Sequence, residues 1–251
     1  MTTLSDDDLY LRGARTAVAS WEEYARGAHG AAVLRMPGVA AAVFPSEPER
    51  SVYNNALLDR DLSGSQRADA LDAMAAAYAT AGVARFAAWV HESDTAMRRD
   101  IEQHGYKLDT STRAMGMALD GIRLARPELD LTAPSWTEYV RTFDLPAGLL
   151  DGADHSAFHL LVARLDGENV ATALAFDHGG DCGIYNVGTL ERARRRGLGT
   201  KLTALHLYDA LARGCRTASV QSTKMAENVY AAAGLRDLGV ILEYVPEAAL
   251  G

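Results

Sequence analysis

The chain has 251 residues, of which 48% are hydrophobic, and its formal net charge is −8. This negative charge argues against a nucleic-acid-binding protein, because a phosphate backbone requires a broad basic surface. The hydrophobic fraction is sufficient for globular cores, and the length fits one large domain or two domains of about 125 residues.

The N-terminus and the cysteines indicate a soluble, cytoplasmic protein. The first residues, MTTLSDDDLY, are acidic where a signal peptide would be basic and then apolar. No run approaches the roughly 18 apolar residues that a membrane helix needs, so no membrane partner is expected. Cys182 and Cys215 lack CxxC spacing, and we expect reduced, buried thiols. The histidines show no metal-ligand spacing, so no metal site is expected either.

The first half of the chain reads as alternating helical and extended segments. Ser5 and Asp8 predict a helix start, and apolar residues then recur at spacings of three and four as far as Trp21. Further elements follow in this order: a hairpin around Pro37-Gly38, a strand in SVYNNALL, a helix capped by Ser63 and Gln66 and ended by Gly82, a strand in RFAAWVH, a short helix over 94–104, and a strand in RAMGMAL.

The second half begins after an irregular stretch over 121–134 that contains two prolines. Ser135 and Glu138 form an S-x-x-E capping box ahead of a short helix. The remaining predicted elements are a hairpin around Asp166-Gly167, a strand in CGIYNVGTL, a helix over 199–213, a strand in TASVQS, a short helix that contains Tyr230 and ends at Gly234, and a strand in LGVILEYV.

The two halves share one order of predicted elements. Val90 precedes Gly105 by 15 residues and Val220 precedes Gly234 by 14, at matching points of that order. Identity between the halves is low, so coincidence between two mixed α/β pieces remains an alternative. We interpret the pattern as an internal duplication, which predicts an α/β (α+β) fold with domains over 1–125 and 126–251.

The stretch ARRRGLGTKL, over 193–202, predicts a phosphate-binding turn. A glycine-containing loop between a strand and a helix exposes unpaired helical N–H groups and the positive end of the helix dipole. The arginines add charge and bidentate contacts to phosphate oxygens. Because Leu202 replaces the third glycine of G-x-G-x-x-G, and no G-x-x-x-x-G-K-[ST] occurs, neither a Rossmann site nor a P-loop is expected. An ordinary solvated arginine turn is the alternative.

These residues resemble a known signature. RRRGLG matches R/Q-x-x-G-x-G/A, the acyl-CoA motif of the GCN5-related N-acetyltransferase (GNAT) family, and SVQSTKMAENVYAAAGL is similar to the family's fifth strand and fourth helix. The family's Y-x-x-x-G-F reads Tyr230 to Gly234 here, with Leu235 in place of Phe. The resemblance covers 135–245 well. The first half resembles the same fold without the acyl-CoA motif, with Ile101 where the second half has Tyr230.

The resemblance implies two tandem GNAT-like domains, each a mixed, mostly antiparallel sheet flanked by helices, with only the second one catalytic. It implies direct transfer of an acetyl group from acetyl-CoA to a primary amine of a small molecule. The backbone N–H of Val187 would polarise the thioester carbonyl, and Tyr230 would protonate the leaving thiolate. The residues implied in cofactor binding are Val187, Gly188, Thr189, Arg194, Arg195, Arg196, Gly197, Leu198, Gly199 and Thr200.

The sequence leaves the acceptor and the general base open. Five residues lie on elements that border the family's cleft, and for each of them a structural or solvent-facing role is favoured over that of a base: Tyr185, Asp177, His178, Glu227 and Glu243. The negative net charge mildly favours a cationic amine. A non-catalytic acyl-CoA sensor and acylation of a hydroxyl or with a longer acyl chain are the competing interpretations, and the oligomeric state is not readable.

Overall fold

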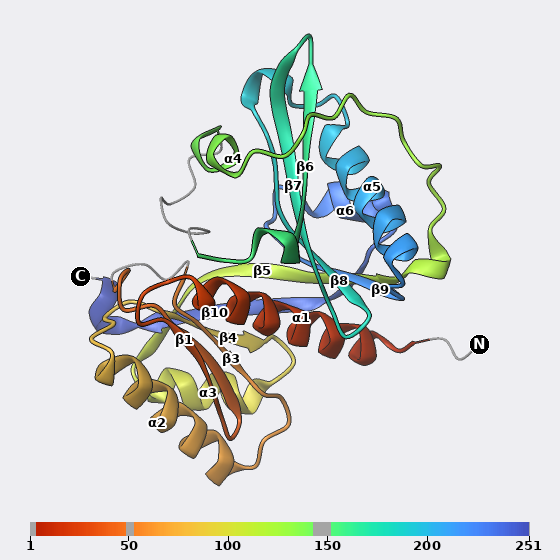
Figure 1. Ribbon diagram of the computed structural model, residues 1–251. Helices are drawn as coiled ribbons and strands as arrows, with labels where there is room; N and C mark the ends of the chain where they lie inside the picture. The colour runs from red at the N-terminus through yellow and green to blue at the C-terminus, as the bar shows by residue number, and fades with distance from the viewer. Residues whose placement is uncertain (1–3, 49–52, 143–151, 251) are drawn as a thin grey trace. The chain divides into compact units, whose positions relative to one another are not determined.

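The chain folds into alternating helices and strands, as seen in a computed structural model that describes residues 4–48, 53–142 and 152–250 (Figure 1). The predicted α/β (α+β) class is confirmed, and the sheet strands are mostly antiparallel with helices on their faces. Each predicted helix and strand is present, although several boundaries differ from those expected.

The first half contains one helix, three strands and then alternating helices and strands. These are α1 (Asp6–Arg26), β1 (Ala32–Met36), β2 (Val39–Val43), β3 (Asn55–Leu58), α2 (Gly64–Thr80), β4 (Ala87–His91), α3 (Thr95–Gln103) and β5 (Tyr106–Ala118), followed by the 3-10 turn η1 (Leu119–Gly121).

The second half repeats this order. Its elements are α4 (Trp136–Thr142), β6 (Phe158–Leu165), β7 (Glu168–His178), β8 (Asp181–Thr189), α5 (Leu198–Arg213), β9 (Thr217–Ser222), α6 (Glu227–Ala233) and β10 (Arg236–Pro246), with 3-10 turns η2 (His155–Ala157), η3 (Glu191–Ala193) and η4 (Glu247–Leu250).

Strand pairing also repeats. In the first half, β1, β2 and β3 pair antiparallel in sequence, and β3 pairs parallel with β4. In the second half, β6, β7 and β8 pair antiparallel and β8 pairs parallel with β9. The last strand of each half is exchanged: β5 pairs with β9, and β10 pairs with β4. The shared order and pairing support the predicted tandem arrangement.

Packing divides the chain into two compact units, and both are interleaved along the sequence. We call one the C-terminal unit; its segments are Met1–Ala17, Arg113–Leu150 and Asp154–Leu238. The other is the N-terminal unit, with segments Val18–Thr112, Asp151–Ala153 and Gly239–Gly251. The interleaving follows from the exchange of β5 and β10 and from α1, whose two ends belong to different units. The domain boundary between residues 125 and 126 stays a prediction.

The core of the N-terminal unit lies between its strands and the helices α2 and α3 (Figure 1). Tyr78 of α2 stacks on Phe86 with ring centroids 3.8 Å apart, and its hydroxyl donates to the carbonyl of Ala42 at 3.0 Å. Met97 and Ile101 of α3 are fully buried in the same cluster. Ile101 therefore fills with hydrocarbon the place that the repeat gives to a tyrosine in the other half.

A carboxylate holds the start of α1 inside the C-terminal unit. Asp181 is buried and accepts hydrogen bonds from Thr217 Oγ1 and Ser219 Oγ, each at 2.7 Å, and Thr16 contributes another. Burial raises the pKa of Asp181, and these hydroxyl donors act in the opposite direction. Gly13 permits the close approach, since a Cβ there would lie 2.7 Å from the Cβ of Ser219.

His206 on α5 is a buried imidazole in the C-terminal unit. It is 1% exposed, hydrogen-bonds with the backbone of Ala173, and its Nε2 has no partner among the residues described. Burial lowers the pKa of His206 from 6.5 to about 4, an effect that the bond to Ala173 partly offsets. The ring is therefore neutral near pH 7.

We expect His206 to make the protein less stable in mild acid. The folded-state pKa lies below the unfolded value, so the stability is complete above pH 6.5 and is lost as the pH falls toward 4. Between pH 7.5 and pH 5 the expected loss is about 2 kcal/mol in the free energy of unfolding. Urea titrations at both pH values test this, and His206→Gln should reduce the difference; an unchanged difference contradicts the assignment.

Both cysteines are free and buried, as predicted. Burial raises the pKa of Cys215 to about 12 and raises that of Cys182 well above its usual value. Because the thiolate is the reactive form, we expect Ellman's reagent to label neither thiol in the native protein and both in urea. Rapid labelling of the native protein would contradict this burial.

No helix among the described residues is long and apolar enough to cross a membrane.

Candidate functional site

Two adjacent parallel strands of the C-terminal unit separate after a short shared ladder. Strand β8 pairs with β9 only from Asp181 to Gly183, opposite Thr217 to Ser219. Beyond this point β9 continues to Ser222 in pairing with β5 on its other side. The edge of β8 that faced β9 is thus released from Ile184 to Thr189. Such a released edge offers backbone N–H and C=O groups to a ligand.

A bulge lies within the released part of β8. On the β7 side the register shifts between the pairs Tyr185–Leu174 and Gly188–Thr172, so β8 carries one more residue than its partner. Asn186 has a φ of 49°, which is unusual for a residue with a side chain. Val187 and Gly188 follow directly. Bulges re-aim the backbone at functional sites, and the sequence contained no signal for this one.

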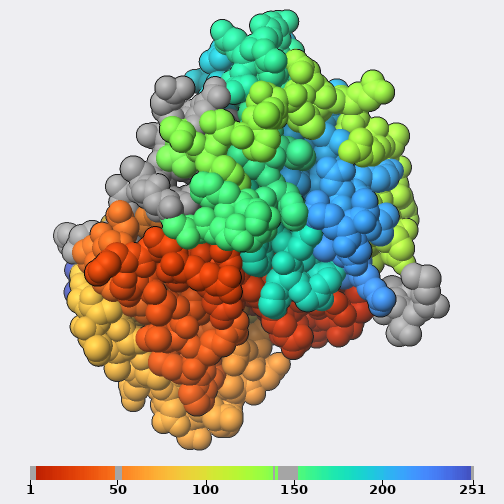
Figure 2. Space-filling view, in the orientation of Figure 1, coloured from red at the N-terminus to blue at the C-terminus, as the bar shows by residue number. Residues whose placement is uncertain are grey.

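The arginine–glycine loop leads from β8 into an uncapped helix. Gly197 is the N-cap of α5 with a φ of 73°, and no side chain accepts from the first-turn N–H groups. Arg195 also has a left-handed φ of 63°, and such outliers cluster at ligand sites. Residues 194–197 are exposed, and α5 lies at the surface (Figure 2). Unpaired N–H groups, a helix dipole and three guanidinium groups together fit an anion.

The matching helix in the N-terminal unit is closed to an anion. Ser63 caps α2: its hydroxyl accepts from the N–H of Gln66, and the Gln66 side chain accepts from the N–H of Ser63 at 2.9 Å. A side-chain cap occupies the same N–H groups that a phosphate would use. The difference between α2 and α5 restricts the candidate phosphate site to the C-terminal unit.

Gly199 brings three of the predicted site elements together. A Cβ on Gly199 would lie 3.3 Å from Cγ1 of Val229 on α6 and 3.6 Å from Cγ1 of Val187 on β8. The start of α5 therefore touches both the bulged strand and the helix that carries Tyr230 (Figure 1). Thr189 also receives a hydrogen bond on its carbonyl from Arg194 Nε at 3.3 Å.

Tyr230 is a buried side chain rather than a surface one. It is 4% exposed and packs in an apolar cluster that includes Cys182, Cys215 and Leu235. Burial raises the pKa of Tyr230 to about 12. The phenol therefore keeps its proton throughout the physiological range, as a proton donor must.

The five residues named as possible bases lie in different settings. Burial alone would raise the pKa of Asp177, but hydrogen bonds from His159 and Arg213 hold it well below its usual range. Glu227 is paired with Arg113 and Lys224, which lower its pKa.

Of the other three, His178 is exposed and Tyr185 is half-buried. Glu243 is half-buried and belongs to the N-terminal unit, where burial raises its pKa. Within the C-terminal unit, both carboxylates are held as ions by cations, and neither is poised to take a proton near pH 7.

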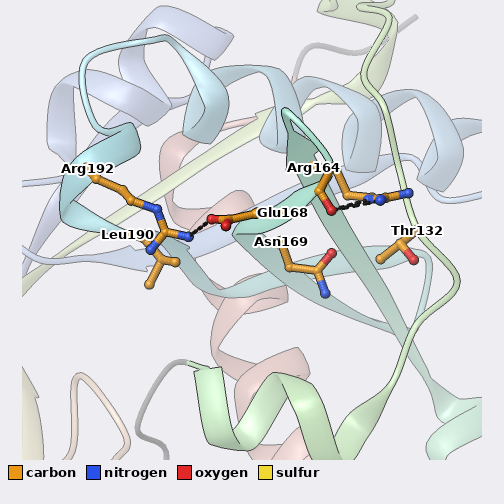
Figure 3. Close-up of a pocket in the computed structure, with 7 residues that line it drawn as sticks. Thr132, Arg164, Glu168, Asn169, Leu190 and Arg192 are labelled. Carbon is orange, nitrogen blue, oxygen red and sulfur yellow. Dashed lines mark hydrogen bonds and ion pairs between the residues drawn. The ribbon is translucent and has the colours of Figure 1, made fainter.

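A polar pocket of about 650 Å³ lies at the end of β8 (Figure 3). It contains two arginines that are not part of the predicted site. Arg192 forms an ion pair with Glu168, and Arg164 donates twice to the carbonyl of Gly167. Because the carboxylate of Glu168 already neutralises Arg192, this pocket is a weaker anion site than the loop over 194–197. Among the described residues, no group of three or more potential metal ligands occurs.

Sequence comparison matches residues 125–239 to the model of the acetyltransferase (GNAT) family. This segment is the part of the chain that holds the separated strands, the uncapped helix and Tyr230. Residues 125–239 belong to the GNAT family. Members of this family transfer acyl groups, and acyl transfer is thus the general activity that the family indicates.

Solved structures resemble the whole chain. A GCN5-related N-acetyltransferase from Kribbella flavida has a TM-score of 0.71 at 16% identity, covering 94% of this chain and 95% of that one. Another from Sphaerobacter thermophilus has a TM-score of 0.58 at 16% identity, covering 97% and 93%.

A tandem GNAT protein from the clavulanic acid biosynthesis pathway has a TM-score of 0.57 at 13% identity, covering 96% of both chains. At these identities the likeness concerns the fold, which is that of a tandem GNAT protein. No curated protein matches the sequence significantly.

Proposed function

We propose that this GNAT protein transfers an acetyl group from acetyl-CoA to a primary amine of a small molecule, with the chemistry confined to the C-terminal unit. The observation that carries the proposal is the contrast between α5, whose N-terminus is uncapped and preceded by three exposed arginines, and α2, whose N-terminus is capped. A protein that only had to fold would be equally well served by a side-chain cap on both helices, so the uncapped start of α5 points to a bound ligand.

The residues of the loop fit a pyrophosphate. The first-turn N–H groups of α5 can donate to phosphate oxygens, and Gly197 leaves open space where a side chain would stand, with no atom within 4 Å of a Cβ. Arg194, Arg195 and Arg196 supply the counter-charge. The three arginines are the longest run of consecutive basic residues in a chain of net charge −8.

The released edge of β8 suits the pantetheine arm and the thioester. Val187, Gly188 and Thr189 present backbone groups that no β9 residue pairs with. An N–H held in place at the thioester oxygen, assigned to Val187, would stabilise the developing oxyanion by about 3 kcal/mol. The bound acetyl-CoA supplies the activated acetyl group.

Tyr230 is the proposed proton donor to the leaving thiolate. A phenol of pKa about 12 gives a proton to an exposed thiolate only at a cost, because an ordinary thiol has a pKa of about 8.5. A thiol in the same apolar surroundings behaves differently: burial raises the pKa of Cys215, in the cluster around Tyr230, to about 12. A leaving thiolate held in such apolar surroundings would therefore be a stronger base than in water, which favours transfer of the proton from Tyr230.

An assay of acyl transfer tests the proposed function. The purified protein is incubated with acetyl-CoA and a panel of primary amines, and free thiol release and the mass of the acetylated amine are both measured. We expect transfer to at least one cationic amine, at a rate well above spontaneous hydrolysis. Binding of acetyl-CoA without turnover on any amine would instead indicate an acyl-CoA sensor.

A further inference from the structure

Three neighbouring strands of the N-terminal unit place an indole, a carboxylate and a hydroxyl in a row. Trp89 on β4 lies directly opposite Glu243 on β10 in antiparallel register, so both side chains project from the same face with Cβ atoms about 5 Å apart. Thr112 Oγ1 of β5 donates to Glu243 Oε1 at 3.3 Å. Trp21 of α1 packs against Trp89 edge to face, with ring centroids 5.1 Å apart. We call these residues the Trp21–Trp89–Glu243 cluster.

Glu243 carries a negative charge that the described residues do not balance. No lysine, arginine or histidine in the described ranges forms an ion pair with it, whereas Glu247, four residues later, pairs with Lys107 at 2.5 Å. Burial raises the pKa of Glu243, and the one charged contributor, Asp109, is itself negative. A half-buried carboxylate normally has a cationic partner. The negative charge of Glu243 would therefore attract a cationic ligand.

Trp89 carries a hydrogen-bond donor that is also unmatched. Its Nε1 is buried and has no partner among the residues the structure describes. Buried indole N–H groups usually find an acceptor, and an oxygen atom of a ligand would provide one. The two indole rings add a π surface, which attracts ammonium groups.

The cluster is accessible from solvent, since Trp89 and Glu243 are both half-buried and not sealed. We propose that it binds an ammonium group that stands next to a hydroxyl or carbonyl oxygen, as in an amino sugar or an amino alcohol. Glu243 pairs with the ammonium group, the ring of Trp89, which is held by its edge-to-face contact with Trp21, lies beside it, and Trp89 Nε1 donates to the neighbouring oxygen. This inference goes beyond the proposed function, because it gives the N-terminal unit a ligand site of its own.

Tryptophan fluorescence in a Trp136→Phe background measures binding at this cluster, because Trp21 and Trp89 are then the only remaining tryptophans of the three. We expect a saturable change with glucosamine, which carries an ammonium group beside hydroxyls, and none with glucose, which lacks the cation. Cadaverine, which has ammonium groups without oxygen, should bind more weakly than glucosamine. Equal responses to glucose and glucosamine would overturn the proposal.

Two substitutions assign the contacts. Glu243→Gln should raise the Kd for glucosamine by about tenfold or more, because it removes the charge and keeps the shape. The matched control is Glu247→Gln, an exposed carboxylate on the same C-terminal segment, which should leave the Kd unchanged. Trp89→Phe keeps an aromatic ring without the N–H, so it should abolish the preference for glucosamine over cadaverine. Unchanged Kd in Glu243→Gln, or an unchanged preference in Trp89→Phe, overturns the proposal.

Titration of acetyl-CoA into the same variants separates this inference from the proposed function. If Glu243→Gln loses glucosamine binding and retains acetyl-CoA binding, the cluster is an amine site independent of the cofactor. If the wild type binds acetyl-CoA and transfers acetyl groups, but no amine perturbs Trp21 or Trp89, the inference fails while the proposed function stands. If glucosamine binds and no acetyl transfer occurs, the proposed function fails while the site stands.

Discussion

Tyr230→Phe should lower kcat by about a hundredfold and leave the affinity for acetyl-CoA nearly unchanged. Positioned general acids contribute factors of about 10² to 10⁴, and the phenylalanine ring preserves the packing of a side chain that is 4% exposed. The measurement is steady-state thiol release on the best amine of the panel, with the Kd for acetyl-CoA determined by calorimetry.

A matched tyrosine in the same unit provides the control. Tyr208 of α5 donates its hydroxyl to the carbonyl of Leu124 at 2.7 Å, so Tyr208→Phe removes one hydroxyl without touching the proposed chemistry. It should leave kcat within about twofold, since a lost hydrogen bond of about 1 kcal/mol affects stability here and not the reaction. Equal kcat values for Tyr230→Phe and the wild type would show that Tyr230 only contributes packing and is not the proton donor.

Gly197→Glu should weaken acetyl-CoA binding by about a hundredfold or more. The new carboxylate would compete for the free N–H groups of α5 and would repel the pyrophosphate. The helix start would then no longer attract an anion. The φ of 73° adds conformational strain for any side chain. Calorimetric titration of acetyl-CoA gives the affinity, and thermal melting shows whether the fold survives.

Gly214 closes the other end of the same helix and allows a matched substitution. It has a φ of 97° and nothing within 4 Å of a Cβ, so Gly214→Glu makes the same chemical change under similar backbone strain. It should cost comparable stability and leave acetyl-CoA affinity intact. Similar affinities for the two variants would show that the start of α5 is not the phosphate site.

Local chemistry in the sequence predicted most elements of the fold. The cap at Ser63, the hairpin turn at Asp166-Gly167 and the glycine end of α5 at Gly214 all lie where expected, because each depends on residues close together in the chain. The start of β5 was wrong: RAMGMAL marks only its second part, and the strand begins at Tyr106. Residues 107–111 are all exposed, so they lack the alternation that reveals a half-buried strand.

Long-range pairing could not be predicted from the sequence. Nothing in the periodicity of β5 or β10 indicates that β5 pairs with β9 and β10 with β4, because apolar alternation encodes a buried face and not a partner. The strand expected from Ser51 is Asn55–Leu58, and Ser51 itself lies outside the described residues.

Part of the candidate site could be predicted from the sequence and part could not. The loop over 194–200 and Tyr230 were recognisable because motif residues stand at fixed spacings, and their roles remain predictions. The bulge at Asn186 and the Trp21–Trp89–Glu243 cluster were missed. Glu243 was named only as one of several possible bases, since its neighbours Trp89 and Trp21 come from distant parts of the chain.

The two halves differ at the positions on which the proposed site depends. The N-terminal unit has the cap formed by Ser63 and Gln66 where α5 has an open helix start, and it has Ile101 where the other half has the phenol of Tyr230. Neither change disturbs the order of strands. Each is stabilising in its own right, because a cap is worth about 1 kcal/mol and a buried isoleucine side chain about 1.5–3 kcal/mol.

The stoichiometry of acetyl-CoA binding tests the central claim most directly. Isothermal titration calorimetry of the wild-type protein should give one site per chain with a micromolar Kd, because α5 presents an uncapped helix start next to a released strand edge, whereas its counterpart α2 in the N-terminal unit is capped. Two equivalent sites per chain would contradict the assignment of the chemistry to the C-terminal unit. An absence of binding would contradict the account as a whole.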